Sequence, residues 1–376
     1  MREKYLEKVN RIVVKIGTKS LVNNKSLLHR KKVKKLVAEI AELFKKGKEF
    51  IIVSSGAIIS GAGILGLNER PRTIPEKQGA ASVGQIILMD TYKEFFEKYG
   101  IKIGQVLLTE DDLKNRKRYL NARNTLLTLI EDFKVIPIIN ENDVVGIEEI
   151  VFGDNDILAA LVANLISADL LILLTNIDGF CIQKNGKQIL LQEIKKITDE
   201  IENYAGKSDD KFGTGGMKSK IQAAKISTHS GIPVIIANSD EKNILQRILS
   251  SEIIGTFFYP NEKALSQRKR WIAYSVVPKG KIIVDQGAKE ALIERGKSLL
   301  PGGIIKIEGK FNTGDPVDVL DEDNNIIGRG LVNYDNTIIE KIKGKKSNYI
   351  KSIVGEKYYP EVIHRDNLVI YLSHLS

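Results

Sequence analysis

The stretch RIVVKIGT, Arg11–Thr18, is a run of mostly β-branched residues that ends in a glycine and a threonine. Near-continuous apolar runs of this kind are typical of strands buried on both faces of a parallel sheet. Amphipathic stretches such as Lys31–Lys46 separate this run from the later ones. The later runs are EFIIVSSG at 49–56, KVIPIINEN at 134–142, DLLILLTN at 169–176 and IPVIIANS at 232–239. The first two thirds of the chain therefore predict an α/β fold, a mainly parallel sheet sandwiched by helices.

Each apolar run ends in glycine or polar residues rather than in more apolar ones. These ends are Gly17-Thr18, Ser54-Ser55-Gly56, Asn140-Glu141-Asn142-Asp143, Thr175-Asn176 and Asn238-Ser239. In open parallel sheets, ligands bind beyond the carboxyl ends of the strands. We therefore expect a binding site at this edge of the sheet.

The pattern changes near NEKALSQRKRWIAYS, 261–275, where a charged connector meets the only tryptophan. Short strands and tight turns follow, with one helix candidate around Ala288–Arg295. A chain of 376 residues also exceeds the size at which single domains usually stop growing. We expect a larger domain at 1–262, a linker at 263–276 and a small, mainly β domain at 277–376.

Charge and composition narrow the class of protein. The net charge of +10 is spread over lysine-rich helix faces such as HRKKVKK, which favours solubility and some attraction for anionic ligands. The single cysteine, Cys181, excludes an internal disulfide and indicates a reducing, cytoplasmic compartment. The four histidines are too scattered for a metal site or a triad. The longest apolar region, 157–175, is interrupted by Asn164 and Asp169, so we expect no membrane span.

The stretch DDKFGTGGMKSK, Asp209–Lys220, places two lysines in the first turns of a helix expected from about Met217. Lysine there opposes the helix dipole, and a glycine turn before a helix commonly holds phosphate. The P-loop pattern fails because Met217 separates Gly216 from Lys218, and a dinucleotide motif fails as well. Either another kind of nucleotide site or a solvated surface loop explains the stretch.

One cluster of acidic and amide side chains ends an apolar run and another directly precedes an expected helix, and Lys15 lies among apolar neighbours at the end of the first run. The clusters are INENDVV, 139–145, and GDND, 153–156. A helix cap explains only one of these polar groups. Together they suggest a small zwitterionic substrate beside a polyphosphate, because phosphoryl transfer needs mainly positioned positive charge. Asp156 could hold the ammonium groups of Lys15 and Lys220, and Asp143 could pair with a substrate amine.

The ordered motifs resemble those of the glutamate 5-kinase family, within the amino acid kinase superfamily, carrying a C-terminal PUA module. The motifs run through essentially the whole chain: VVKIGT, VSSGAI, KQGAASVGQ, RYLNARNTL, INENDVV, GDND, GTGGMKSK, RKRW, ERGKSLLPGGI and VIHRDN. The resemblance implies that residues 1–262 are the amino acid kinase catalytic domain and that 277–376 are PUA-like.

The resemblance also implies residue roles. Lys15, Lys220 and Asp156 fall on catalytic positions, the two lysines contacting ATP phosphates and the acid organising them. The positions implied for ATP are Lys15, Thr175, Asn176, Thr214, Gly215, Gly216, Met217, Lys218, Ser219 and Lys220. Those implied for glutamate are Ser55, Asn140, Asp143, Asp154 and Asn155. Many family members have an aspartate where this chain has Asn176, which puts the charge of that contact in doubt. We expect no protein metal ligand, because phosphates and water would carry Mg²⁺.

The activity that the resemblance implies is ATP-dependent phosphorylation of the L-glutamate side-chain carboxylate, the first step of proline biosynthesis. It also implies feedback inhibition by proline and a dimer or tetramer. Alternative readings are another kinase of the superfamily, acting on acetylglutamate, aspartate, carbamate or uridylate, and an RNA-binding role of the last hundred residues. The basic stretch EKIKGKKSNYIK suits RNA, but aromatic residues are sparse, so we do not expect RNA binding.

Overall fold

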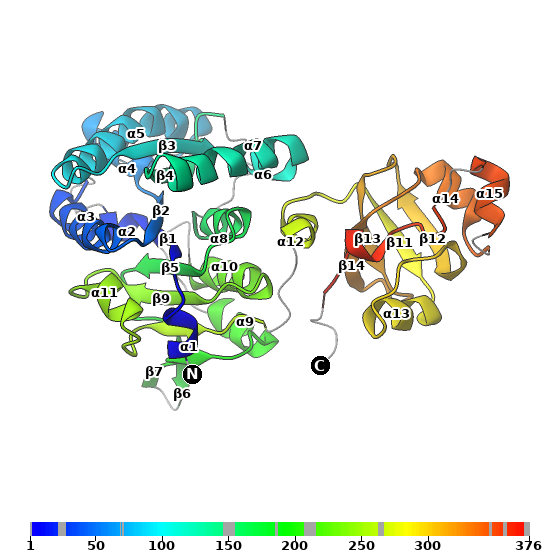
Figure 1. Cartoon of the computed structure of the whole chain (residues 1–376). Helices are drawn as coiled ribbons and strands as arrows, with labels where there is room; N and C mark the ends of the chain where they lie inside the picture. The colour runs from blue at the N-terminus through cyan, green and yellow to red at the C-terminus, as the bar shows by residue number, and fades with distance from the viewer. Residues whose placement is uncertain are drawn as a thin grey trace. The chain divides into compact units, whose positions relative to one another are not determined.

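The computed structural model describes residues 2–21, 28–67, 69, 71–145, 155–184, 187–206, 216–261, 267–345, 348–355 and 359–371. The chain divides into two compact units, Met1–Ala264 and Leu265–Ser376 (Figure 1). The helix α12, Gln267–Tyr274, lies inside the range expected to be a linker and belongs to the second unit.

The first unit is built on an eight-stranded sheet with the order β3-β4-β2-β1-β5-β9-β10-β8. Its strands are β1 (Arg11–Ile16), β2 (Glu49–Ser54), β3 (Ile103–Leu108), β4 (Ile136–Glu141), β5 (Leu170–Thr175), β8 (Glu193–Ile194), β9 (Val234–Asn238) and β10 (Thr256–Phe258). The first six in the order are parallel, whereas β10 runs antiparallel to β9. The five apolar runs are thus strands of one parallel sheet, as predicted.

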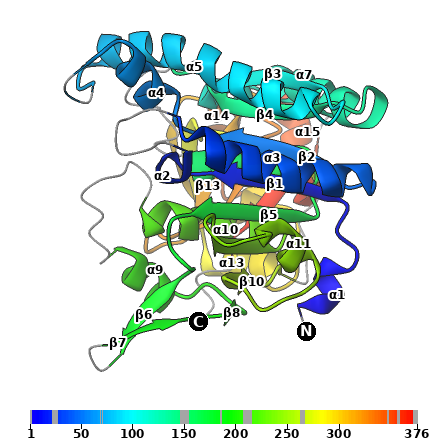
Figure 2. The same ribbon diagram turned by 90° about the vertical axis from the view of Figure 1, so that its left-hand side faces the viewer.

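Helices cover both faces of this sheet. The even-numbered side chains of β1 pack with α3, α5 and α11 in one core, and the opposite face contacts α8. Figure 1 shows α3 and α11 on one side of the strands and α8 and α10 on the other, and Figure 2 shows α3 on the near face. Because side chains alternate along a strand, Lys15 lies on the α8 side of β1.

The helices of the first unit agree with the predicted alternation. They are α1 (Glu3–Leu6), α2 (Thr18–Leu21), α3 (Arg30–Lys45), α4 (Ala57–Ile64), α5 (Ile74–Glu97), α6 (Glu110–Lys114), α7 (Arg116–Leu127), a π-helical turn at Thr128–Asp132, α8 (Asn155–Leu165), α9 (Asp199–Gly206), α10 (Met217–His229) and α11 (Ile244–Leu249). A separate two-stranded sheet pairs β6 (Cys181–Lys184) with β7 (Lys187–Leu190).

Two glycines bring α4 and α5 into direct backbone contact. A Cβ atom at Gly61 would lie 1.8 Å from the carbonyl oxygen of Ala80, and one at Gly84 would lie 1.8 Å from that of Ala57. Gly56, which precedes α4, has a φ of 98°, a left-handed conformation that favours glycine. The turn after β2 and the crossing of α5 over α4 therefore both depend on residues without a side chain.

The second unit contains a five-stranded sheet with the order β12-β11-β13-β14-β15. The strands are β11 (Gly280–Val284), β12 (Ile304–Gly309), β13 (Pro316–Leu320), β14 (Ile326–Leu331) and β15 (Leu368–Ile370). Besides α12 and short 3₁₀ turns at Pro301–Gly303 and Arg365–Asn367, its helices are α13 (Gln286–Ile293), α14 (Asn336–Ile342) and α15 (Asn348–Val354). The single expected helix corresponds to α13. The expectation of only one was wrong: α12, α13, α14 and α15 all have seven or eight residues, and helices this short give a weak periodic signal whether or not they are noticed.

Candidate active site

The carboxyl ends of β1, β2, β4 and β5 meet at one edge of the first sheet, since all four strands are parallel. Lys15 of β1 lies in register with Val53 of β2 and Leu173 of β5. It therefore lies one residue before the end of its strand, between two neighbours. The predicted site residues that follow these strands are consequently gathered at the same edge.

Asp156, the second residue of α8, joins the two predicted lysines. Its Oδ1 atom lies 2.5 Å from Lys15 Nζ, and its Oδ2 atom lies 3.0 Å from Lys220 Nζ on α10. Asp156 is fully buried, and the two lysines are 3% and 6% exposed. Ser219 Oγ also donates to Asp156 Oδ2 at 3.1 Å. A single buried carboxylate thus holds two ammonium groups from distant parts of the chain.

The electrostatics of this cluster favour an anion. Two lysines and one aspartate carry a formal net charge of +1, and all three are more than nine-tenths buried. Burying net charge is costly unless a group of opposite sign approaches. Polyphosphate oxygens are groups of that sign and are strong acceptors for ammonium groups.

The start of α10 provides the other part of the predicted nucleotide loop. Gly216 precedes the helix and makes no side-chain cap, and its carbonyl oxygen accepts a hydrogen bond from Ser219 Oγ at 2.8 Å. Lys218 is exposed and Met217 is half-buried, whereas Ser219 and Lys220 both contact Asp156. Thr214 and Gly215, also predicted for this loop, lie outside the described residues.

A chain of amide side chains lies beside the charged cluster. Asn155 Nδ2 donates to the backbone oxygen of Ser54 at 2.9 Å, to Ser55 Oγ at 3.0 Å and to Asn140 Oδ1 at 2.8 Å. Asn140 Nδ2 in turn donates to Gln85 Oε1 at 2.9 Å. Three of the predicted substrate residues, Ser55, Asn140 and Asn155, are therefore in direct contact.

Asp143 follows β4 and is half-buried. Burial raises the pKa of its carboxyl to about 6, because desolvation penalises the charged form. Near neutral pH the group is ionised but poorly solvated, a state that a cationic partner would stabilise. Asp154, the remaining predicted substrate residue, lies outside the described residues.

Thr175 and Asn176 end β5 at the same edge. Thr175 is buried, and its Oγ1 atom donates to Asn176 Oδ1 at 3.4 Å. Asn176 is exposed. Its side chain therefore faces solvent at the end of β5, the strand next to β1, and is not part of the buried cluster of Lys15, Asp156 and Lys220.

Two residues with side chains at this site were not predicted. Gln85 on α5 contacts Asn140, and Tyr92, also on α5, shares a hydrogen bond of 3.1 Å with the buried Ser54 Oγ. Burial raises the pKa of Tyr92. Both lie inside a long helix, where apolar periodicity carries no indication of a site. The glycine directly before Gln85, in the quoted motif KQGAASVGQ, is the one feature that could have drawn attention to it.

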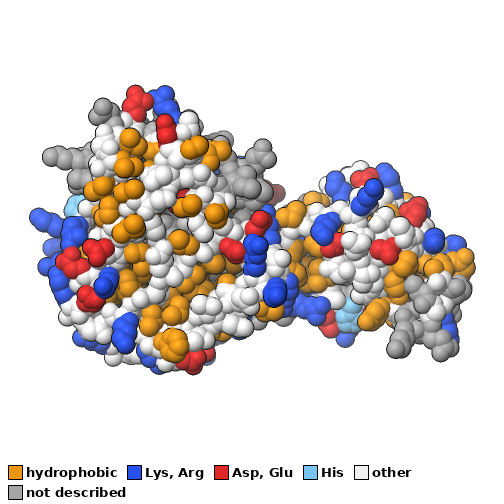
Figure 3. Space-filling model, turned by 90° about the horizontal axis from the view of Figure 1, so that it is seen from above, with side chains coloured by type: hydrophobic (Ala, Val, Ile, Leu, Met, Phe, Trp, Pro, Cys, Tyr) orange, Lys and Arg blue, Asp and Glu red, His pale blue; other side chains and the backbone are white. Residues whose placement is uncertain are grey.

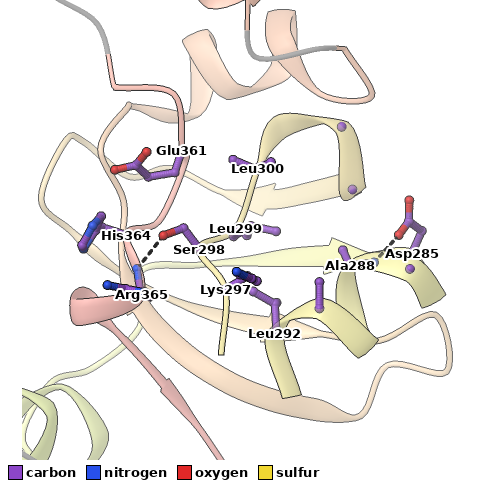
Figure 4. A pocket seen from close by; sticks show the side chains of 14 residues that line it. Asp285, Ala288, Leu292, Lys297, Ser298, Leu299, Leu300, Glu361, His364 and Arg365 are labelled. Carbon is purple, nitrogen blue, oxygen red and sulfur yellow. Dashed lines mark hydrogen bonds between the residues drawn. The ribbon is translucent and has the colours of Figure 1, made fainter. Parts of the chain in front are cut away.

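The second unit has a cavity of about 780 Å³ that is lined by α13, by the segment 297–303 and by residues between 361 and 365. Figure 4 shows Glu361, His364 and Arg365 on one side of it and Asp285 on the other, with Leu292 and Leu299 along the wall. Acidic and basic side chains are mixed at its rim. His364 is the one aromatic side chain among the residues that line this cavity, and no phenylalanine, tyrosine or tryptophan lies beside it there, whereas single-stranded RNA is commonly bound by several aromatic rings on which successive bases stack.

Two further features concern the residues that the structure describes. No helix among them is both long and apolar enough to cross a membrane. No three histidine, cysteine or acidic side chains among them come together in a group that could hold a metal ion.

The sequence was compared with protein families and with known proteins. The model of the amino acid kinase family matches residues 10–238, and the model of the PUA domain matches residues 280–354. Glutamate 5-kinase from Thermoanaerobacter sp. (strain X514) is 49% identical over 365 residues, which cover 96% of this chain and 97% of the relative. Glutamate 5-kinase from Geobacter sulfurreducens is 48% identical over 373 residues, covering 98% and 100%. Carbamate kinase from Giardia lamblia bound to AMP-PNP is a more distant solved structure, 18% identical with a TM-score of 0.49, covering 68% of this chain and all of that one.

Proposed function

Because the chain belongs to the glutamate 5-kinase family of the amino acid kinases, we propose that it phosphorylates the side-chain carboxylate of L-glutamate. The products are L-glutamyl 5-phosphate and ADP, and the reaction is the first step of proline biosynthesis. The observation that carries this proposal is the buried cluster of Lys15, Asp156 and Lys220 at the carboxyl edge of the sheet.

In this proposal the two lysines bind the phosphate chain of ATP. Their combined charge exceeds that of Asp156 by one, so the cluster attracts phosphoryl oxygens. Asp156 contacts both ammonium groups. It therefore acts as a positioning residue that keeps them the right distance apart before ATP arrives. Preorganised charge of this type lowers the barrier because no rearrangement is needed during transfer.

The amide chain and Asp143 form the glutamate site of the proposal. Asn155, Asn140 and Ser55 are already ordered by mutual hydrogen bonds, and Asp143 supplies a negative charge for the substrate's ammonium group. Asp154 completes the site by sequence position. Glutamate and the terminal phosphate would then meet where α8 begins, since Asn155 and Asp156 are consecutive and their side chains serve the two sites.

The transfer itself needs no protein base. The glutamate side chain is already ionised at neutral pH, and one of its oxygens attacks the γ-phosphorus in line. A new C–O–P bond forms while the bond between the γ-phosphorus and the bridging oxygen breaks, and ADP leaves with that electron pair. Lys15 and Lys220 stabilise the charge on the transferred oxygens.

The rest of the nucleotide site is assigned by sequence position and by the carboxyl end of β5, where Asn176 is exposed. Residues 214–220 would cradle the phosphates, and Thr175 and Asn176 would contact the nucleotide. Asp156, the acid at the centre of the site, is engaged by two lysines, so the described residues fit Mg²⁺ only as an ion carried by the nucleotide. When bound, Mg²⁺ would neutralise phosphate charge.

The proposal extends to assembly, regulation and location. Apolar side chains gather on the face of the first unit seen in Figure 3, and the exposed ones around α4 and α5 include Ile64, Leu65, Leu67 and Ile86. Exposed apolar groups of this kind support a homo-oligomer, a dimer or tetramer. Feedback inhibition by proline and a cytoplasmic location complete the proposal, consistent with a biosynthetic use of ATP and free glutamate.

A substrate panel tests the proposal. ADP release is measured for the purified full chain with ATP, Mg²⁺ and either glutamate, acetylglutamate, aspartate, carbamate or uridylate, each with and without proline. We expect glutamate to give the highest kcat/KM and proline to lower the rate. A higher kcat/KM for any other acceptor would refute the proposed substrate, and a rate unchanged by proline would refute the proposed regulation alone.

A further inference from the structure

Gln85 lies on α5, outside every residue set assigned above to ATP or glutamate. Its Oε1 atom accepts a hydrogen bond from Asn140 Nδ2. Asn140 is itself 3% exposed and contacts Asn155. Gln85 therefore stands at the far end of the amide chain that leads to the glutamate site.

The orientation of every amide in this chain is fixed by backbone groups at its ends. The backbone N–H of Glu141 can only donate, so the atom of Asn140 that contacts it at 2.9 Å must be oxygen. The backbone oxygen of Ser54 can only accept, so the atom of Asn155 that contacts it must be nitrogen. It follows that Asn140 donates from its nitrogen to Gln85, and that the atom of Gln85 that accepts this hydrogen bond must be its oxygen.

The same logic fixes the outward end of the chain. The nitrogen of Asn155 has two hydrogens and lies within hydrogen-bond distance of three acceptors, so it has no donor left for a ligand. Its oxygen makes no hydrogen bond to any residue that the structure describes, so it remains available to accept one. An ammonium group is a donor without acceptor capacity. The chain thus ends in an acceptor oxygen, which is the polarity that the ammonium group of an amino acid requires.

Gln85 is not explained by stability alone. Its Nε2 atom is buried and has no hydrogen-bond partner among the described residues. A buried donor without a partner is unfavourable, and an apolar side chain of the same size would avoid it. The oxygen of Gln85, which accepts the hydrogen bond from Asn140, is therefore the atom that favours glutamine at this position.

The backbone holds Gln85 in place on the other side. Gly84 lies directly before it, and the close approach of Gly84 to the carbonyl group of Ala57 sets α5 against the beginning of α4. Ala57 follows Ser55 by two residues. The distance between Gln85 and the turn after β2 is therefore determined by backbone contact rather than by adjustable side chains.

We propose that Gln85 is a positioning residue for glutamate, which fixes Asn140 and through it the acceptor oxygen of Asn155. The inference rests on the proposed function. Without the oxygen of Gln85, Asn140 loses one of its three anchoring hydrogen bonds, and Asn155 loses a fixed partner. Glutamate binding should weaken, whereas the lysine cluster that serves ATP should remain as it is.

The test uses Gln85→Met in the full chain, with Gln85→Leu in parallel so that the result does not depend on the folding of one variant. We expect KM for glutamate to rise about five- to tenfold, as the loss of one hydrogen bond predicts, while KM for ATP changes less than twofold. The melting temperature should change little, because the variant removes the unpaired Nε2 donor of Gln85 but leaves the buried Nδ2 donor of Asn140 without its acceptor. Ser82→Ala is the matched control, because Ser82 on the same helix bonds only the backbone oxygen of Gln78.

A double-mutant cycle separates positioning from a general effect. In an Asn140→Ala background, Gln85→Met should change KM for glutamate less than twofold, because the partner through which it acts is gone. An equal increase in both backgrounds, or equal increases in KM for ATP and glutamate, would overturn the inference. If the unmodified chain releases ADP with glutamate but Gln85→Met leaves both KM values unchanged, only this inference fails. Absence of glutamate-dependent ADP release from the unmodified chain would instead refute the proposed function.

Discussion

At the scale of single residues, the site is dominated by one carboxylate shared between two lysines. Asp156 is fully buried and contacts Lys15 and Lys220 with different oxygens. A pair of one lysine with Asp156 would be neutral and would attract an anion only weakly. The additional lysine leaves the cluster with a positive charge, and this surplus connects the geometry with the proposed phosphate chemistry.

Replacing Lys220 should separate catalysis from folding. In Lys220→Ala, Asp156 keeps Lys15 as its partner, so the fold should survive while kcat falls by about 10²- to 10³-fold. Steady-state ADP release and a melting curve measure the two effects. Gln222→Ala is the matched control, because Gln222 lies two residues away on the same helix, is exposed and belongs to no residue set assigned to ATP or glutamate. Similar kcat values for the two variants would contradict the role given to Lys220.

The raised pKa of Asp143 predicts that kcat/KM for glutamate falls as the pH is lowered. Burial raises its pKa to about 6, so its negative charge is present above pH 6 and lost as the pH falls through that value. The side chain of glutamate, with a pKa of about 4.3, stays ionised over most of this range. We expect kcat/KM for glutamate to fall about tenfold per pH unit below pH 6. Asp143→Asn should lower kcat/KM at pH 8 and remove this acidic limb; a variant that keeps the limb would assign it to another group.

Some residues of the candidate site could be predicted from the sequence, and others could not. Lys15 could be placed at the sheet edge because it lies at the end of an apolar run, and Asp156 because it belongs to a polar cluster directly before a predicted helix; the structure brings both into one cluster with Lys220. Their catalytic roles stay predictions. Gln85 could not be found, because a glutamine within a helix is ordinary, and only the folded chain brings it to Asn140.

At the scale of elements, the crossing of α4 and α5 positions the glutamate site. Both Gly61 and Gly84 face backbone atoms of the other helix at distances that exclude a side chain. The turn that carries Ser55 leads into α4, and α5 carries Gln85. A change in this crossing should therefore affect both stability and glutamate binding.

Gly84→Ala tests this crossing. The added methyl group would lie 1.8 Å from the carbonyl oxygen of Ala57, so the helices must separate, at a cost of about 1–3 kcal/mol. We expect a lower free energy of unfolding in urea and a higher KM for glutamate. Gly79→Ala, on the same helix with no atom within 4 Å of the added group, should leave both unchanged. Equal stability of the two variants would show that the helices tolerate separation.

The elements of the first unit were largely predictable and those of the second were less so. Buried parallel strands can be recognised in the sequence as continuous apolar runs. The helix α3 begins one residue before its predicted start. The antiparallel strand β10 has only three residues, and the helices of the second unit have at most eight. Segments this short are stabilised by tertiary packing, which local sequence patterns do not record.

At the scale of the whole molecule, the two units have separate hydrophobic cores. The only tryptophan, Trp271, is buried within the second unit. Its fluorescence therefore reports the unfolding of that unit. Ligands that bind the first unit should stabilise it by mass action without acting on the other.

Thermal unfolding with and without ligands tests this independence. Saturating ATP, Mg²⁺ and glutamate should raise the midpoint seen by far-UV circular dichroism and leave the midpoint seen by tryptophan fluorescence within about 1 °C, since a ligand stabilises only the state that it binds. Proline serves as a second ligand in the same experiment. An equal shift of both midpoints would show that the two units unfold as one.

The most direct test of the account is a crystal structure of the full chain with glutamate and a nonhydrolysable ATP analogue. The account predicts phosphate oxygens about 3 Å from both Lys15 Nζ and Lys220 Nζ, with the glutamate ammonium group beside Asn155 and Asp143. A triphosphate that contacts neither lysine, or a glutamate molecule bound away from Asn155, would contradict it.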